Sequence, residues 1–129
     1  MKRFFVVLPL LLTSLFAKDH INFWQKLFTE PVEKVCIIMK DKTVFRFTNL
    51  YERMVYLSVE RVEKELKKRS YKIKDIEIVI HNHLADCKFS PSDESQYRAL
   101  KERGFAGLFL LYCHRTNKTY DIEKEGSRK

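Results

Sequence analysis

Glycine is scarce in this 129-residue sequence, where it occurs only at Gly104, Gly107 and Gly126. The sequence therefore has neither a glycine-rich loop for binding phosphate nor the Gly-x-Ser-x-Gly turn that carries the nucleophile of many serine hydrolases. It also lacks internal repeats, low-complexity segments and Gly/Ser-rich linkers. Residues 18–129 have the length of one small domain, with no room for a second hydrophobic core, so we expect a single compact domain.

A long hydrophobic run is also missing. Residues 4–16 are mostly apolar, but this segment is shorter than the roughly 18–20 residues that cross a membrane. Lys2 and Arg3 give it a positive start, and the small residue Ala17 follows it, which is the pattern of a secretory signal peptide over residues 1–17. We therefore expect an exported protein, periplasmic or secreted, which is anchored in a membrane if this segment is not cleaved.

The cysteine count is odd. Cys36, Cys87 and Cys113 cannot all pair within one exported chain, so one thiol is free or bonded to another molecule. If the strands that end near His83 and Cys113 lie side by side and parallel, Cys87 and Cys113 both lie just beyond their carboxyl ends. A disulfide between them is then geometrically reasonable. The alternative is that Cys36 and Cys113 are small core residues.

The excess of positive charge is moderate, with a net charge of +8. Around residues 63–69 the basic side chains are mixed with acidic ones on one helical face, which is the pattern of a solvated surface. Phosphate or an acidic partner could use this face, but nucleic-acid binding is a less favoured interpretation.

The rest of the chain alternates helices with strands. Apolar or alternating runs predict strands at residues 35–39, 44–48, 76–83, 105–113 and 119–122. Helical spacing of apolar residues predicts helices over residues 21–30, over residues 51–69, and from Ser90 or Ser92 to Arg103. Gly104 is placed to end the last of these helices, and residues 123–129 are typical of a frayed, charged tail. The predicted fold class is α/β (α+β), with a mixed sheet flanked by helices.

Two histidines stand at the end of the most apolar strand. Residues 76–80 read Ile-Glu-Ile-Val-Ile, and side chains of a strand alternate between its faces, so His81 and His83 are expected on the same side. Ser90 and Asp93 follow after a short loop, where the next helix is predicted to begin. Two imidazoles and a carboxylate are the three protein ligands of a catalytic zinc, which keeps a fourth position open for water.

These elements and residues resemble the JAB/MPN superfamily of JAMM-type zinc metalloproteases. The signature of that family is a glutamate near the first strand, then His-x-His, then Ser-x-x-Asp at the start of the next helix. The matching positions in this sequence are Glu33, His81, His83, Ser90 and Asp93. The resemblance covers most of residues 20–122, implies a cytidine-deaminase-like fold, and is closest to the RadC branch because of His-Asn-His.

The sequence departs from the family pattern in two ways. Leu84 stands where the family usually has proline after the second histidine, and the stretch to the aspartate is one residue shorter than usual. A shifted register would use Ser92 and place Ser95 at the aspartate position, so we prefer Ser90 and Asp93, which preserve both residue types. Glu30 is an alternative to Glu33.

Each candidate residue has a chemical role in this interpretation. Zn²⁺ is held by His81, His83 and Asp93, and Glu33 takes a proton from the attacking water and passes it to the leaving amine. Ser90 donates a hydrogen bond to the oxyanion that forms on the attacked carbonyl. Ser90 and Asp93 could also serve only as caps of the helix.

Three functions are consistent with the sequence. The favoured one is an exported zinc-dependent hydrolase, a metallopeptidase or isopeptidase-like enzyme acting on a peptide or protein substrate. The alternatives are an inactive member of the same fold that binds a protein partner, and a RadC-like protein associated with DNA. A further hypothesis places the thiolate of Cys87 in the open zinc position, where it would silence the site.

Overall fold

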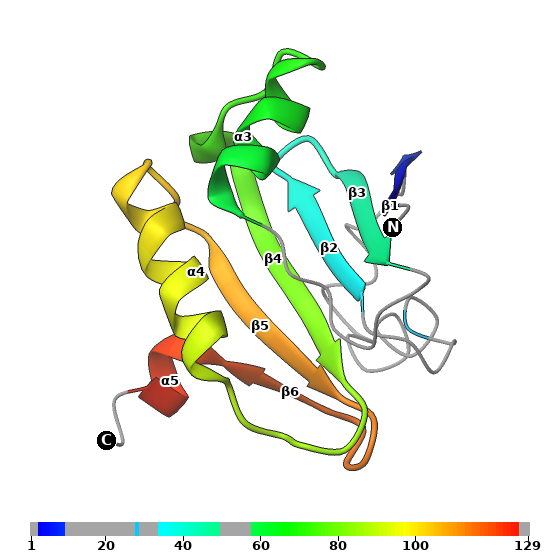
Figure 1. The fold of residues 1–129 in the computed structure, drawn as a ribbon, viewed down its shortest axis with the longest axis vertical. Coiled ribbons are helices and arrows are strands. Elements are labelled where there is room, and N and C mark those ends of the chain that lie inside the picture. The colour runs from blue at the N-terminus through cyan, green and yellow to red at the C-terminus, as the bar shows by residue number, and fades with distance from the viewer. Residues whose placement is uncertain (1–2, 10–27, 29–33, 50–57, 127–129) are drawn as a thin grey trace.

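The computed structural model describes residues 3–9, 28, 34–49 and 58–126. These residues form a six-stranded mixed sheet with helices packed on it. The strand order is β1-β3-β2-β4-β5-β6, and every neighbouring pair is antiparallel except β4 and β5. The strands are β1 (Arg3–Pro9), β2 (Lys34–Met39), β3 (Thr43–Asn49), β4 (Ile76–His83), β5 (Leu108–Cys113) and β6 (Lys118–Asp121). This is the mixed sheet that the sequence predicted (Figure 1).

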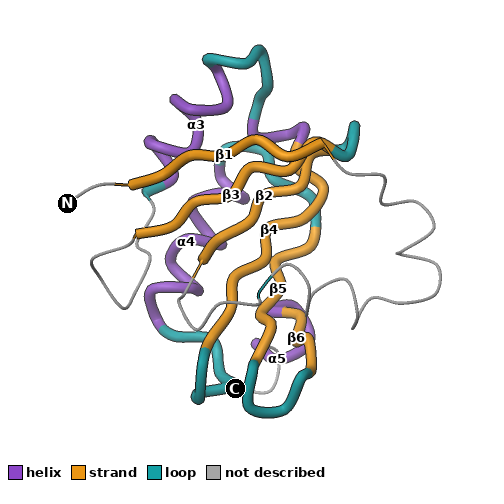
Figure 2. Tube along the Cα trace, turned by 90° about the vertical axis from the view of Figure 1, so that its right-hand side faces the viewer, coloured by secondary structure: helices purple, strands orange, loops and turns teal. Residues whose placement is uncertain are grey.

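Three helices bury their apolar residues against one face of this sheet. They are α3 (Val59–Lys67), α4 (Pro91–Glu102) and α5 (Ile122–Gly126), and a 3₁₀ turn, η1 (Ile73–Asp75), leads into β4. Figure 2 shows α3 and α4 together on one side of the sheet. Val62 and Leu66 of α3, Leu100 of α4 and Ile122 of α5 belong to the same buried cluster as Val79 and Phe109 of the sheet.

Side chains alternate between the two faces of the sheet along the strands, apart from an irregularity in the pairing of β2 with β4 between Ile38 and Met39. Val35 and Ile37 of β2 pack under the helices, whereas Cys36 and Ile38 lie on the opposite face with Phe28. Branched apolar residues in this pattern favour strands because each face receives every second side chain. The predicted strands are thus confirmed, although β5 begins at Leu108, later than expected, and Ile122 belongs to α5 instead of the last strand.

The ends of α4 follow local sequence signals. Ser90 is the N-cap and Pro91 opens the first turn. At the other end the amides of Gly104 and Phe105 donate to the carbonyls of Lys101 and Leu100, and Gly104 has a φ of +104°. This is the paired arrangement in which glycine stops a helix at low cost, so the predicted limits of this helix are confirmed.

Two predicted elements differ from the structure. Ser58 is extended and its hydroxyl accepts a hydrogen bond from the amide of Arg61, so α3 begins at Val59 and the predicted single helix over residues 51–69 is wrong. The charged tail is also not frayed throughout, because residues 122–126 form α5. Asp121 accepts a hydrogen bond from the amide of Glu123, and burial of Ile122 fixes the helix against the core.

The predicted signal peptide overlaps β1, which pairs with β3 at the edge of the sheet. Cleavage after Ala17 would remove β1 and leave β3 as the edge strand. The signal peptide stays a prediction, and the helix predicted over residues 21–30 lies outside the described residues apart from Phe28.

Gly107 lies where a side chain would collide with β4. A Cβ atom at this position would overlap the backbone carbonyl of Glu77, whereas one at Gly104 would have room and meet only backbone strain from the positive φ. We expect Gly107→Ala to lower the free energy of unfolding by about 2–3 kcal/mol, the upper part of the usual cost of overpacking, and Gly104→Ala to lower it by about 1 kcal/mol. Urea denaturation of both variants measures the difference, and equal losses would contradict the close approach.

Cys36 is the one cysteine outside the disulfide, since Cys87 is bonded to Cys113. Burial raises the pKa of the Cys36 thiol to about 12, against the smaller opposing effects of Arg46 and Lys34. We expect a thiol reagent at about pH 8 to find no reactive thiol in the native protein, because the thiolate is the reacting form. It should find one thiol per chain after denaturation and three after added reduction; a thiol that reacts in the native protein would contradict this placement.

Candidate metal centre

The end of β4 places two imidazoles on the face covered by the helices. His81 is buried, and its ring packs against those of Phe89 and Phe109, at centroid distances of 6.0 and 5.7 Å. The ring of His83 lies 5.0 Å from that of His81, in an edge-on orientation. Alternation along the strand therefore brings the two side chains together, as the sequence predicted.

Asp93 reaches the same point from the first turn of α4. Its carboxylate oxygen Oδ2 accepts a hydrogen bond from the amide of Ser90 at 2.7 Å, and its own amide donates to the Ser90 hydroxyl at 3.1 Å. This reciprocal capping box holds the aspartate in one orientation and anchors the helix start. The proposed capping of the helix by Ser90 and Asp93 is thus confirmed, and it does not compete with a role for Asp93 as a ligand.

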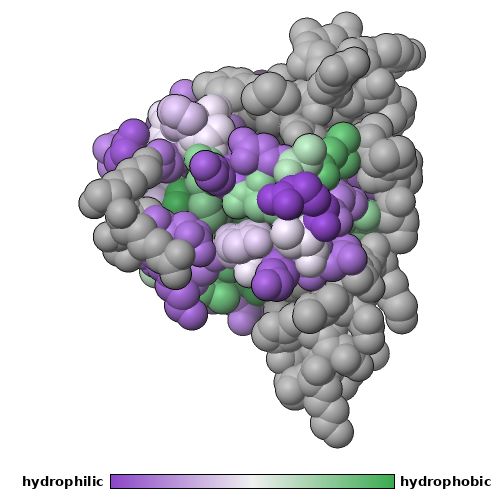
Figure 3. All heavy atoms as spheres, turned by 90° about the horizontal axis from the view of Figure 1, so that it is seen from below, coloured by the Kyte–Doolittle hydropathy of each residue, from purple (hydrophilic) through white to green (hydrophobic). Residues whose placement is uncertain are grey.

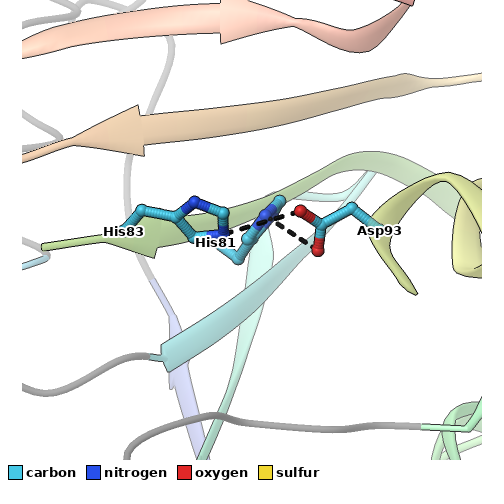
Figure 4. A group of neighbouring side chains, drawn as sticks. All are labelled: His81, His83 and Asp93. Carbon is cyan, nitrogen blue, oxygen red and sulfur yellow. Dashed lines mark ion pairs between the residues drawn. The ribbon is translucent and has the colours of Figure 1, made fainter. Parts of the chain in front are cut away.

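The three side chains converge on one small volume (Figure 4). The Nε2 atom of His81 lies 3.2 Å from Oδ1 of Asp93, and Nε2 of His83 lies 3.5 Å from Oδ2. One potential ligand atom from each of the three residues lies within 4.8 Å of the other two. Two imidazole nitrogens and a carboxylate oxygen at this separation can hold a single metal ion.

Hydrogen bonding selects the form of His83 that binds a metal. Its Nδ1 atom lies 2.9 Å from the backbone carbonyl oxygen of Asp86. A carbonyl only accepts hydrogen bonds, so Nδ1 carries the hydrogen and donates it. In the neutral ring the lone pair then lies on Nε2, which faces Asp93, and metal-binding histidines are usually oriented by such a bond.

The Nε2 atom of His81 gives a test of whether these residues suit a metal. It is buried and has no hydrogen-bond partner among the described residues, and its 3.2 Å contact with Oδ1 of Asp93 is an ion-pair contact. Buried polar atoms without a partner are rare, and each needs an explanation. A cation between the imidazole and the carboxylate would satisfy both groups, so the donor set fits a metal ion.

Asp93 is held in its charged form. Burial by itself raises the pKa of this carboxyl, but the adjacent imidazole of His81, the amide of Ser90 and the imidazole of His83 together lower the pKa below its ordinary value. An ionised carboxylate is the form that binds a metal. The surroundings of Asp93 therefore prepare it as a ligand.

Asn82, the middle residue of His-Asn-His, lies on the opposite face of the sheet from the two histidine side chains. Asn82 is buried, and its Oδ1 atom accepts a hydrogen bond from the backbone amide of Lys34 at 2.6 Å. Its Nδ2 atom lies 2.8 Å from Nε2 of His114 and, being a donor only, donates to it. Burial and then the charge of Lys34 lower the pKa of His114, which favours this neutral, accepting ring. Alternation along β4 predicts that Asn82 lies on this face, but no pattern in the sequence predicts its hydrogen bonds with Lys34 and His114.

The remaining candidate residues are placed as follows. Ser90 adjoins the site as the N-cap of α4, and Ser95, which a shifted register would use in place of Asp93, is exposed. Glu33 and Glu30 lie outside the described residues. Cys87 is bonded to Cys113, which confirms the expected disulfide. The hypothesis that a Cys87 thiolate fills the open metal position is therefore wrong for this form of the protein.

Comparison with known proteins gave no match: no family model, no curated protein and no solved structure matches this chain. The resemblance to the JAB/MPN superfamily thus stays a prediction. Among the described helices, none combines the length and the apolar character that crossing a membrane requires.

Proposed function

We propose that this protein is an exported zinc-dependent hydrolase of the JAB/MPN type that cleaves a peptide or amide bond. The observation that carries the proposal is the convergence of His81, His83 and Asp93, with a buried imidazole nitrogen that has no hydrogen-bond partner in the part of the chain that the structure describes. The order of the elements adds support for the JAB/MPN type. The two histidines end β4, and Asp93 lies in the first turn of α4, the helix that joins the parallel strands β4 and β5.

We assign zinc to this donor set. Two imidazoles and one carboxylate are a common catalytic zinc set, and three protein ligands leave a position open for water or substrate. In such a site zinc supplies a Lewis acid and lowers the pKa of water to about 7, which makes a nucleophile at neutral pH.

Contacts within the protein hold these three side chains in position without a bound metal. The capping box fixes Asp93, the carbonyl of Asp86 fixes the ring of His83, and two phenylalanine rings flank His81. Ligands already held in place lose little conformational entropy on binding. The aromatic rings also lower the local polarity, which strengthens electrostatic interactions in the site.

Ser90 and Glu33 complete the proposed machinery. The Ser90 hydroxyl accepts from the amide of Asp93, and its own hydrogen is not used in that bond, so it can be donated to an oxyanion. Glu33 directly precedes Lys34, whose amide Asn82 holds at the start of β2. We assign Glu33 the role of general base, which takes the proton of water and delivers it to the leaving amine.

The test is elemental analysis of the purified protein together with hydrolysis of a peptide library. We expect about one zinc per chain, and cleavage that stops when zinc is removed by a chelator and returns with added zinc. Glu33→Gln should keep the zinc and lose at least about 100-fold in rate, the lower end of what a general base contributes. Absence of zinc after incubation with the metal would instead make the three side chains a structural ion-pair cluster and turn the search to protein partners.

A further inference from the structure

The loop between β4 and α4 carries the carbonyl group that orients His83. This loop, residues 84–90, is the segment that separates the two histidines from Asp93 in the chain. Leu84, Ala85 and Asp86 are exposed, so core packing does not hold this part of the loop in place. Figure 3 views this end of the molecule, where hydrophilic residues predominate around smaller hydrophobic patches.

Polar and covalent links hold the loop instead. The disulfide joins Cys87 to Cys113 at the end of β5, and the side chain of Arg115 donates through Nε to the carbonyl of Ala85 at 3.0 Å. Arg115 also lies 3.6 Å from Sγ of Cys87, and the amide of His114 donates to the carbonyl of His83 at 3.0 Å. These links come from the turn between β5 and β6, which lies beside the loop at the lower end of Figure 1.

The bonded groups flank Asp86 on both sides. Ala85 is tied by Arg115 and Cys87 is tied by the disulfide, so the peptide unit that contains the Asp86 carbonyl is held at each end. That carbonyl fixes the hydrogen on Nδ1 of His83 and so leaves the lone pair on Nε2, toward Asp93. The orientation of a metal ligand thus depends on a turn that does not itself contact the metal site.

We propose that Arg115 and the Cys87–Cys113 disulfide are positioning groups for the metal ligand His83, acting through the backbone carbonyl of Asp86. The expected effect on metal affinity rests on the proposed function. The orientation of the His83 ring does not, because the hydrogen bond to Asp86 forms without metal. Loss of the links lets the loop move, the Asp86 carbonyl leaves Nδ1, and His83 divides between its two neutral tautomers. Partners of this kind typically contribute 10–100-fold to metal affinity.

The experiment compares the metal-free wild type with two variants by nuclear magnetic resonance of ¹⁵N-labelled histidine. It is run at a pH well above the ordinary imidazole pKa of about 6.5, so that neutral rings are observed. One variant, Cys87→Ser with Cys113→Ala, lacks the disulfide. The other, Arg115→Ala, removes an exposed side chain and tests the same link without a change in the core. Val62→Ala, in the core under α3, is the control for a general loss of stability.

We expect His83 to carry its hydrogen on Nδ1 in the wild type and in Val62→Ala, and to divide between tautomers in both variants. The zinc dissociation constant should rise roughly 10–100-fold in the variant without the disulfide, and by less in Arg115→Ala, with Val62→Ala close to the wild type. A ring that keeps its Nδ1 hydrogen in both variants would overturn the proposal. A wild type that binds no zinc would refute the proposed function, and the tautomer measurement would still decide the positioning role.

Discussion

Changing His81 and His83 together to alanine is expected to abolish zinc binding and peptide hydrolysis. Only Asp93 of the three ligands would then remain, and a lone carboxylate does not retain zinc against water. The loss of affinity should exceed about 100-fold, the largest effect usually seen when only an outer partner of a ligand is removed. Titration with zinc in competition with a coloured chelator measures this loss, and elemental analysis of the purified variant confirms it.

The matched control is His114→Gln. This imidazole lies on the opposite face of the sheet and accepts a hydrogen bond from Asn82, which a glutamine oxygen can also accept. The control should keep one zinc per chain. Zinc retained by the His81 and His83 double variant, or lost equally in His114→Gln, would refute the proposed ligand set. Circular dichroism establishes that each variant is folded.

Removal of the disulfide is expected to produce the largest loss of stability. The bond between Cys87 and Cys113 spans 26 residues, and closing a loop of this size is expected to stabilise the folded state by about 3 kcal/mol through its effect on the unfolded chain. The variant Cys87→Ser with Cys113→Ala should lose that free energy of unfolding and melt roughly 10 °C lower. Urea denaturation and calorimetry under oxidising conditions measure both quantities.

A reducing agent supplies the control for this prediction. Reduced wild type lacks the same link, so its free energy of unfolding should fall to near that of the variant, whereas the variant itself should not respond. A wild type as stable after reduction as before it would show that the disulfide contributes little. If the reduced wild type were still much more stable than the variant, the loss in the variant would come from the packing of Cys113, which is fully buried.

Local patterns in the sequence predicted most of the structure that positions the site. The apolar run before His81 and the alternation along it are properties of a short segment, and they placed His81 and His83 on one side of a strand. The start of α4 was equally local, since the Ser-x-x-Asp pattern satisfies amides within its own first turn. The parallel pairing of β4 with β5 was only a condition in the sequence argument; the structure has this pairing, and it brings Cys87 to Cys113.

Other parts of the prediction failed because the spacing of apolar residues does not show which hydrogen bonds and packing contacts form. The apolar spacing of residues 51–69 suits one long helix, but Ser58 satisfies the amide of Arg61 and starts α3 there. Residues 123–126 look like a tail by composition, yet Ile122 packs into the core and the chain behind it forms α5. The hydropathy pattern predicts neither the start of α3 nor the formation of α5, because it reports the spacing of apolar residues but not which hydrogen bonds form.

The sequence by itself determined the candidate ligands and the strand and helix that carry them, because each depends on neighbours a few residues away. It left the pairing of the cysteines open, because Cys87 and Cys113 are 26 residues apart. Only the tertiary structure decided that the Asp86 carbonyl orients His83, that Arg115 holds the loop around it, and that Asn82 links Lys34 to His114. These partners lie up to 48 residues apart. They meet because the sheet aligns the strands from which they come, and no local pattern records that alignment.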